Sequence, residues 1–198
     1  MKNGIKKHIT SEWLKAYPGL TAYEQNKLYK IVGPFICGIE LINLPRSAEY
    51  RPHFVLYPLF ENDIKSCLEF PTLLLEFYND RELQLDLPYS DPKKLYKEAQ
   101  DIVSKRLPIS FSQEVNSCQL YQLIDRVLLN DMSYKAAWSR ASLLRIKLYT
   151  ASYVKDRIQV ANVWREIQNE STHWNMQNFE LCHGRFDLWR SEEHTSEL

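Results

Sequence analysis

The stretch FICGIELINLPRSAEYRPHFVLYPLF, residues 35–60, decides the class of fold that the sequence predicts. Its first part, residues 35–44, is apolar and β-branched, as in a strand, and the PRSAEY segment after it is typical of a turn. In residues 53–60, the side chains at even positions (Phe54, Leu56, Pro58 and Phe60) then alternate with those at odd positions (His53, Val55, Tyr57 and Leu59), as on the two faces of a strand. A short turn between two strands favours antiparallel pairing, because parallel strands need a long crossover.

Segments further along the chain extend this predicted sheet. Residues 65–70 and 72–78 have the composition of strands, and Asn79-Asp80 between the second of these and the next segment is a plausible hairpin turn. The opening of 72–78 could also begin a helix. The clearest period of two in the chain sets Leu83, Leu85 and Leu87 against Glu82, Gln84 and Asp86. We therefore expect an antiparallel meander of four to five strands.

Two short helices are predicted before the sheet. Residues 11–17 follow a capping residue, Thr10 or Ser11, and stop at Pro18-Gly19. Thr21 is then expected to cap a second helix over residues 22–32, which Gly33-Pro34 would end.

The second half of the sequence is helical in pattern. Ser90-Asp91-Pro92 is a typical helix start, and the helix that it opens is expected to reach about Arg106. From Ser112 onward, apolar residues recur at helical spacing, which brings the helices after the sheet to four or five. The predicted class is α+β, with a helix-plus-sheet region over 1–110 and a helical region over 111–189 packed on it as one unit. The predicted apolar stripes are Val115, Cys118, Tyr121, Ile124 and Leu128; Tyr134, Ala137, Ala141, Leu144 and Leu148; and Val154, Ile158, Ala161, Trp164 and Ile167.

The last nine residues, RSEEHTSEL (190–198), resemble the translation of a sequencing adapter, and we interpret them as non-native. The alternatives are a natural polar terminus and an interaction motif, but one His among three Glu is a poor set of metal ligands. The full chain has 25 basic and 25 acidic residues. Without the tail's one Arg and three Glu, 24 and 22 remain, a net charge of +2, so the chain is close to neutral either way.

Composition and motifs exclude several classes of function. The five glycines form no GxGxxG, GxxxxGK[ST] or GxSxG pattern, so phosphate-cradling loops and the α/β-hydrolase nucleophile elbow are not expected. There is no HExxH and no Cys/His quartet, and we expect no metal and no cofactor. The four dispersed cysteines suggest buried thiols in a reducing compartment. No apolar run approaches the length of a membrane span, which predicts a soluble cytoplasmic protein without a membrane partner.

A metal-dependent hydrolase or nuclease is the sharpest enzymatic hypothesis. Such sites place an acidic residue on one strand and an acidic-x-Lys pair on the next, to hold Mg²⁺ and polarise a phosphate. Asp63-Ile64-Lys65 has that form, and Glu82, with Asp86 beyond it and Glu76 on the preceding segment, is a looser variant. Such triplets are common by chance, and solvated charge on a strand face explains them better.

One face of the meander is the most plausible place for a polar ligand or partner. If Leu83, Leu85 and Leu87 pack under the helices, the opposite face carries a set of polar side chains. This set is Glu82, Gln84 and Asp86, with Glu40, His53 and Glu69 as candidates to join it.

Residues 133–165 have the strongest excess of cations in the chain. Seven basic residues oppose only Asp156, a net of +6, and aromatic residues are interleaved with them. Such a mixture could bind nucleic acid through Lys135, Arg140, Arg145 and Arg157. At helical spacing, however, the first three point in different directions, which favours amphipathic helices with solvated cations.

The function that the sequence favours is therefore non-catalytic. We expect an adaptor or an inhibitor-type module that binds another protein, since no catalytic motif is found and aromatic residues make up 13% of the chain. The alternatives are the metal-dependent hydrolase or nuclease and the helical nucleic-acid-binding module.

Overall fold

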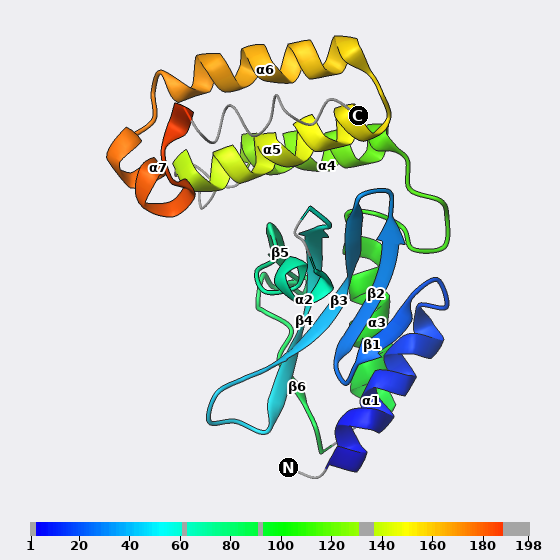
Figure 1. The fold of residues 1–198 in the computed structure, drawn as a ribbon. Helices are drawn as coiled ribbons and strands as arrows, with labels where there is room; N and C mark the ends of the chain where they lie inside the picture. The colour runs from blue at the N-terminus through cyan, green and yellow to red at the C-terminus, as the bar shows by residue number, and fades with distance from the viewer. Residues whose placement is uncertain (1–2, 61–62, 91–92, 131–136, 188–198) are drawn as a thin grey trace. The chain divides into compact units, whose positions relative to one another are not determined.

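The structure is a computed structural model that describes residues 3–60, 63–90, 93–130 and 137–187. Two compact units are distinguished, Met1–Asn116 and Ser117–Leu198, and each is described by itself (Figure 1). The tail 190–198 and Lys135 lie outside the described residues, so the interpretation of that tail as non-native stays a prediction. That the two regions of the sequence pack into one compact unit stays a prediction as well.

The first unit is built on an antiparallel sheet, which confirms the α+β class (Figure 1). The strand order is β1-β2-β3-β4-β5, and β6 pairs with β4 beside that path. The elements of this unit are α1 (Asn3–Ala16), β1 (Thr21–Glu24), β2 (Lys27–Val32), β3 (Phe35–Asn43), β4 (Glu49–Pro58), α2 (Ile64–Cys67), β5 (Leu73–Glu76), β6 (Leu87–Pro88) and α3 (Lys93–Arg106).

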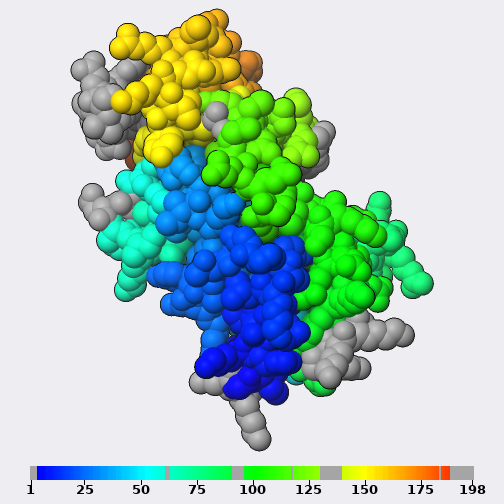
Figure 2. Space-filling view, turned by 90° about the vertical axis from the view of Figure 1, so that its right-hand side faces the viewer, coloured from blue at the N-terminus to red at the C-terminus, as the bar shows by residue number. Residues whose placement is uncertain are grey.

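One face of the sheet, here the α1 face, is covered by α1 and α3. Trp13 of α1 donates a 3.1 Å hydrogen bond to the hydroxyl of Tyr50 on β4, and both side chains are fully buried. The hydroxyl of Tyr17 donates to the carbonyl of Gln100 in α3 over 2.9 Å, which joins the two helices to each other. Figure 2 shows the α1 and α3 segments next to one another at the surface of this unit. The buried side chains of this face include Leu28, Cys37, Ile39, Phe54, Leu56 and Leu73.

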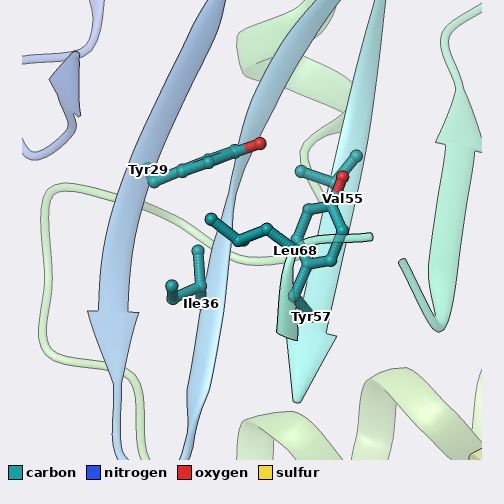
Figure 3. Close-up of a cluster of buried hydrophobic side chains, with 5 residues drawn as sticks. All are labelled: Tyr29, Ile36, Val55, Tyr57 and Leu68. Atoms are coloured by element: carbon teal, nitrogen blue, oxygen red, sulfur yellow. The ribbon is translucent and has the colours of Figure 1, made fainter. Parts of the chain in front are cut away.

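The opposite face, here the α2 face, has a smaller apolar cluster under the segment that follows α2. Leu68 packs there against four side chains from β2, β3 and β4 (Figure 3). Directly paired residues of neighbouring strands point to the same face, so the register places these side chains together. The four are Tyr29, Ile36, Val55 and Tyr57.

The second N-terminal helix that the sequence predicts is absent, and residues 21–32 form a β-hairpin instead. Glu24 pairs with Lys27 across the turn, where Asn26 adopts a left-handed φ of 70°. Asn is one of the few residues that tolerate this conformation, which a two-residue hairpin loop often requires. The Asn26 backbone N–H donates to the Thr10 hydroxyl and its side-chain amide donates to the Tyr89 hydroxyl, so tertiary contacts outweigh the helical pattern. The first predicted helix is present, as the longer α1.

Two predicted strands also differ from the structure. Residues 65–70 do not form a strand, because Asp63 caps the short helix α2 over Ile64–Cys67. Residues 83–87 form only an isolated bridge between Tyr78 and Gln84 and the two-residue strand β6. Arg81 and Leu83 donate backbone hydrogen bonds to the Asn79 side chain, which confirms a turn here. The strands predicted from 35–44, 53–60 and 72–78 are confirmed as β3, β4 and β5.

The second unit is helical, and its central helix α5 (Ala137–Tyr153) contacts the three others. These are α4 (Ser117–Asn130), α6 (Arg157–Ser171) and α7 (Met176–His183). The predicted stripe on α5 is confirmed where it can be tested, since Ala141, Leu144 and Leu148 are buried. Four other predicted core positions are wrong, because Cys118, Val154, Ile158 and Ala161 are exposed.

The cysteines divide between the two units. None of the four forms a disulfide; Cys37 and Cys67 of the first unit are buried, whereas Cys118 and Cys182 of the second are exposed, which corrects the expectation of four buried thiols. Within the described ranges, no helix has both the length and the hydropathy that crossing a membrane requires.

Candidate functional site

A groove of about 580 Å³ lies on the α2 face of the first unit, between the β1–β2 hairpin and the α2 segment. Leu68 and Tyr23 connect it to the apolar cluster, because Leu68 belongs to both and Tyr23 stacks on Tyr29 with ring centroids 5.6 Å apart. Its lining mixes carboxylates and amines. The lining residues are Tyr23, Glu24, Lys27, Asp63, Lys65, Ser66, Leu68 and Glu69.

Asp63, the first acidic residue of the predicted Mg²⁺ triplet, acts as a helix cap. Its side chain accepts hydrogen bonds from the backbone of Ser66 and Lys65 at 3.0 and 2.9 Å, and from the Ser66 hydroxyl at 2.7 Å. These hydrogen bonds, those from Ser66 first, hold the pKa of the Asp63 carboxyl below its ordinary value. Asp63 therefore stays ionised, but its oxygens already accept hydrogen bonds from the backbone N–H groups at the start of α2.

Of the other predicted catalytic residues, only Lys65 lies near Asp63. Lys65 lines the groove beside it, as the triplet requires. Glu82 lies in the turn after β5 with a left-handed φ of 58°. Asp86 forms an ion pair with Arg51 of β4, in which Nη2 donates to Oδ2 over 3.2 Å. Among the residues that the structure describes, no group of three His, Cys, Asp or Glu side chains could hold a metal ion.

A row of polar side chains crosses the α2 face at right angles to the strands. Lys27 pairs with Glu40, Glu40 with His53, and His53 with Glu76, so four neighbouring strands each contribute one residue. We call these four residues the polar row. Strands lie about 4.8 Å apart, so the row spans roughly 14 Å. Lys27 also lines the groove, which makes the groove and the polar row one continuous surface.

Glu40 in this row is held by two phenols. Tyr29 and Tyr57 both donate their hydroxyl hydrogens to Oε1 of Glu40, Tyr57 over 2.6 Å. Burial raises the pKa of both tyrosines, and the neighbouring Glu40 carboxylate raises it further, because a phenolate beside a carboxylate is unfavourable. Both phenols therefore keep their protons and donate them to Glu40.

The next two members of the row, His53 and Glu76, form a pair of which only His53 is buried. His53 is almost fully buried, and its Nε2 lies 3.7 Å from Oε1 of Glu76. Desolvation lowers the pKa of His53, although the Arg51 carbonyl and Glu76 oppose that effect. Hydrogen bonds from Tyr78 at 2.5 Å and Gln84 at 2.6 Å lower the pKa of Glu76. At neutral pH, His53 is thus uncharged and Glu76 is ionised.

Exposed apolar side chains border this surface. Ile31 pairs with Ile36 of the cluster and is 69% exposed, and Leu74 pairs with Val55 and is 41% exposed. Tyr23, stacked over the cluster at the groove, is 48% exposed. An apolar fringe around a charged groove is typical of surfaces that bind other molecules.

Sequence reasoning found part of this surface. It grouped Glu82, Gln84 and Asp86 on one face with Glu40, His53 and Glu69. The structure places Glu40, His53, Gln84 and Asp86 together and Glu69 in the adjoining groove, whereas Glu82 lies in the turn after β5. It missed Lys27, because residues 22–32 were expected to be helical. A signal was present in the Gln25-Asn26 pair flanked by Tyr23 and Tyr29, which is compatible with a hairpin.

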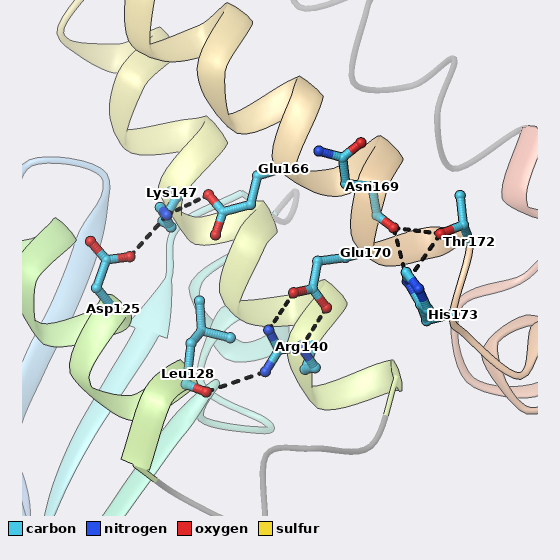
Figure 4. Close-up of polar contacts among 9 residues, drawn as sticks. All are labelled: Asp125, Leu128, Arg140, Lys147, Glu166, Asn169, Glu170, Thr172 and His173. Carbon is cyan, nitrogen blue, oxygen red and sulfur yellow. Dashed lines mark hydrogen bonds and ion pairs between the residues drawn. The ribbon is translucent and has the colours of Figure 1, made fainter.

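The cations predicted to bind nucleic acid in the second unit are largely engaged within that unit (Figure 4). Arg140 makes two hydrogen bonds to Glu170, at 2.6 and 2.7 Å, and a third to the carbonyl of Leu128. The guanidinium of Arg145 lies over the ring of Tyr149 and donates to its hydroxyl. Arg157 is exposed at the start of α6.

Carboxylates from neighbouring helices thus compensate part of the excess of cations in residues 133–165. Lys147, which is 8% exposed, donates to Asp125 of α4 at 2.9 Å and to Glu166 of α6 at 2.6 Å (Figure 4). Asp125, Glu166 and Glu170 all lie outside the 133–165 window in the sequence. The charge count of that window therefore overstated the positive charge of the folded surface.

Comparisons of the chain with protein-family models, with curated proteins and with solved structures found no match.

Proposed function

We propose that the protein is a non-catalytic, protein-binding module of the adaptor or inhibitor type, and that it binds its partner through the α2 face of the first unit. The observation that carries this proposal is the exposure of three apolar side chains on this face, Tyr23 in the groove lining and Ile31 and Leu74 beside the apolar cluster. Apolar side chains gathered at a concave, partly charged surface gain free energy when a partner removes them from water. Four cysteines that form no disulfide support a reducing compartment such as the cytoplasm.

A selection from a displayed library of short random peptides tests this proposal. The full chain should enrich peptides over the bare support, and Ile31→Asp should abolish that enrichment, because it places a charge in the apolar fringe. Ile31 is 69% exposed, so the substitution is compatible with folding. Ile158→Asp is the matched control, since Ile158 is 76% exposed and lies on α6 of the second unit. If no peptide is enriched, or if the two variants behave alike, this face is not the binding surface.

The metal-dependent hydrolase or nuclease is the alternative that the groove itself suggests, since Asp63 and Lys65 both line it. Catalysis of that type needs several carboxylates that converge on the metal ion. Incubation of nucleic acid with the protein and Mg²⁺ decides between the two functions. Hydrolysis that disappears in Asp63→Ala, with the variant still folded, would replace the proposal of a binding module by that of an enzyme.

The helical nucleic-acid-binding module makes a different prediction. Binding through cations to phosphates weakens steeply as salt concentration rises, because counterions are released. Arg157→Ala should then reduce the affinity and the salt dependence together. Since Arg140 and Arg145 already have partners in the second unit, we expect at most weak binding.

A further inference from the structure

The α2 face has an excess of negative charge, although the chain as a whole is neutral. Six carboxylates and three cations belong to the groove, the polar row and the ion pair beside them, which gives 3 − 6 = −3. The carboxylates are Glu24, Glu40, Asp63, Glu69, Glu76 and Asp86, and the cations are Lys27, Arg51 and Lys65.

Two of the three cations are already neutralised. Lys27 lies 3.5 Å from Glu24, and Arg51 pairs with Asp86. Of the cations in this set, Lys65 alone remains to balance the charge of the other four carboxylates, which are Glu40, Asp63, Glu69 and Glu76. The lowered pKa values of Asp63 and Glu76 keep both ionised at neutral pH.

This negative charge is local to the α2 face. On α1 and α3, which cover the opposite face, the described side chains show the reverse balance, with six cations and three carboxylates. The cations are Lys6, Lys7, Lys15, Lys97, Lys105 and Arg106, and the carboxylates are Glu12, Glu98 and Asp101. An anionic ligand such as the phosphates of nucleic acid or lipid would be repelled from the α2 face, whereas a cationic one would be attracted.

We propose that the α2 face binds a basic segment of another protein, in which Lys or Arg side chains alternate with apolar ones. This inference rests on the proposed function and specifies its partner. The apolar residues of the segment would cover Tyr23, Ile31 and Leu74, and its cations would meet Glu69, Asp63 and the polar row. A polar row of roughly 14 Å matches four to five residues of extended chain at about 3.3 Å per residue.

The charge of the selected peptides is the first test. Peptides enriched by the full chain from the displayed random library should carry a higher net positive charge than the starting library. Their binding, measured by fluorescence anisotropy, should weaken as NaCl rises from about 50 mM to about 500 mM, because salt screens the attraction. Enriched peptides that are neutral or acidic would overturn the basic-segment inference and leave the proposed function standing. Failure to enrich any peptide would overturn both.

A pair of charge-reversing variants is the second test. Glu69→Lys changes an exposed residue of the groove lining, and we expect it to weaken binding of a selected basic peptide several-fold at low salt. Asp101→Lys makes the same change of net charge at an exposed position of α3 and should leave the affinity unaltered. If both variants weaken binding equally, the attraction comes from the net charge of the chain and the inference fails. Circular dichroism of each variant shows that the fold is retained.

Discussion

The hydroxyl of Tyr57 lies 2.6 Å from Oε1 of Glu40 and donates its hydrogen to that carboxylate. The two residues sit on neighbouring strands, at the border between the apolar cluster and the polar row. A carboxylate at the edge of an apolar cluster loses part of its hydration, and donors from the protein replace the water. This contact therefore allows an ionised side chain to lie beside the apolar cluster.

Tyr57→Phe removes one of the two phenolic donors of Glu40 and keeps the ring. We expect the free energy of unfolding, measured by urea titration, to fall by about 1 to 2 kcal/mol, since the acceptor is charged and only partly solvated. Tyr23→Phe is the control, because Tyr23 is half exposed and a phenyl ring preserves its stacking on Tyr29. Equal effects of the two substitutions would contradict a specific role for the Tyr57 hydroxyl.

His53 predicts a dependence of stability on pH. Because its folded pKa lies below the ordinary 6.5, the unfolded chain binds more protons, and stability declines as the pH falls from 6.5 toward the folded pKa. Unfolding experiments at about pH 7.5 and about pH 5.5 should therefore show a smaller loss for His53→Gln than for the unaltered chain. His173→Gln, at an exposed position, should retain the full loss.

Glu76 predicts a second pH range in which stability changes, more acidic than that of His53. Its folded pKa lies below the ordinary 4.5, so its contribution to stability is present above 4.5 and is lost as the pH falls through the folded value. Glu76→Gln should thus flatten the stability profile below about pH 4.5. Because Glu76 raises the pKa of His53, the same substitution should deepen the loss of stability below pH 6.5. A flattening confined to higher pH would show that the two groups have been assigned wrongly.

Gly38 is required by the close approach of β2 and β3. A Cβ at this position would meet the Leu28 carbonyl oxygen at 1.9 Å and the Tyr29 ring at 2.9 Å. Gly38→Ala should lower the melting temperature, with a loss of about 1 to 3 kcal/mol from overpacking. Gly4→Ala should leave the melting temperature unchanged or raise it, since Gly4 is inside a helix and a Cβ there would meet no atom within 4 Å apart from the helix's own backbone. A tolerated alanine at 38 would mean that the two strands can separate without loss.

Lys147 joins α4, α5 and α6, and its removal should loosen the second unit. Lys147→Met keeps the aliphatic stem but leaves Asp125 and Glu166 without their shared cation. Because these carboxylates are 50% and 37% exposed, water can replace part of the lost interaction, and we expect a loss of about 1 to 3 kcal/mol. Adding Glu166→Gln should restore part of that stability in a double-mutant cycle, and a strictly additive cycle would argue against the coupling.

The strands that the sequence predicted well are those whose side chains are buried on both faces. In β3 and β4, apolar residues occupy both sets of alternating positions, because α1 and α3 cover one face and Leu68 reaches the other. The β1–β2 hairpin was predicted as a helix, since all of β1 is exposed and carries no periodic burial. Only contacts distant in sequence, such as the hydrogen bond between Asn26 and Tyr89, distinguish the two conformations.

The candidate site was predictable in part for a similar reason. Glu40 and His53 were placed on one face because strand periodicity fixes the direction of a side chain. The partners that decide what these side chains do come from elsewhere, as Asp86 shows by pairing with Arg51 rather than with a metal ion. Asp63 illustrates the limit most clearly, since its acidic-x-Lys spacing suggests chemistry while its local geometry is that of a helix cap.

The difference in burial between the thiols of the two units provides a way to time the opening of the sheet. A maleimide reagent should modify Cys118 and Cys182 at once, because both are exposed, and so mark only the helical unit. Cys37 is buried and burial raises its pKa to about 12, so it reacts only when the sheet opens. The delay before Cys37 is modified, which peptide mapping by mass spectrometry separates from the modification of Cys67, therefore times the opening of the sheet in the native protein without any engineered label.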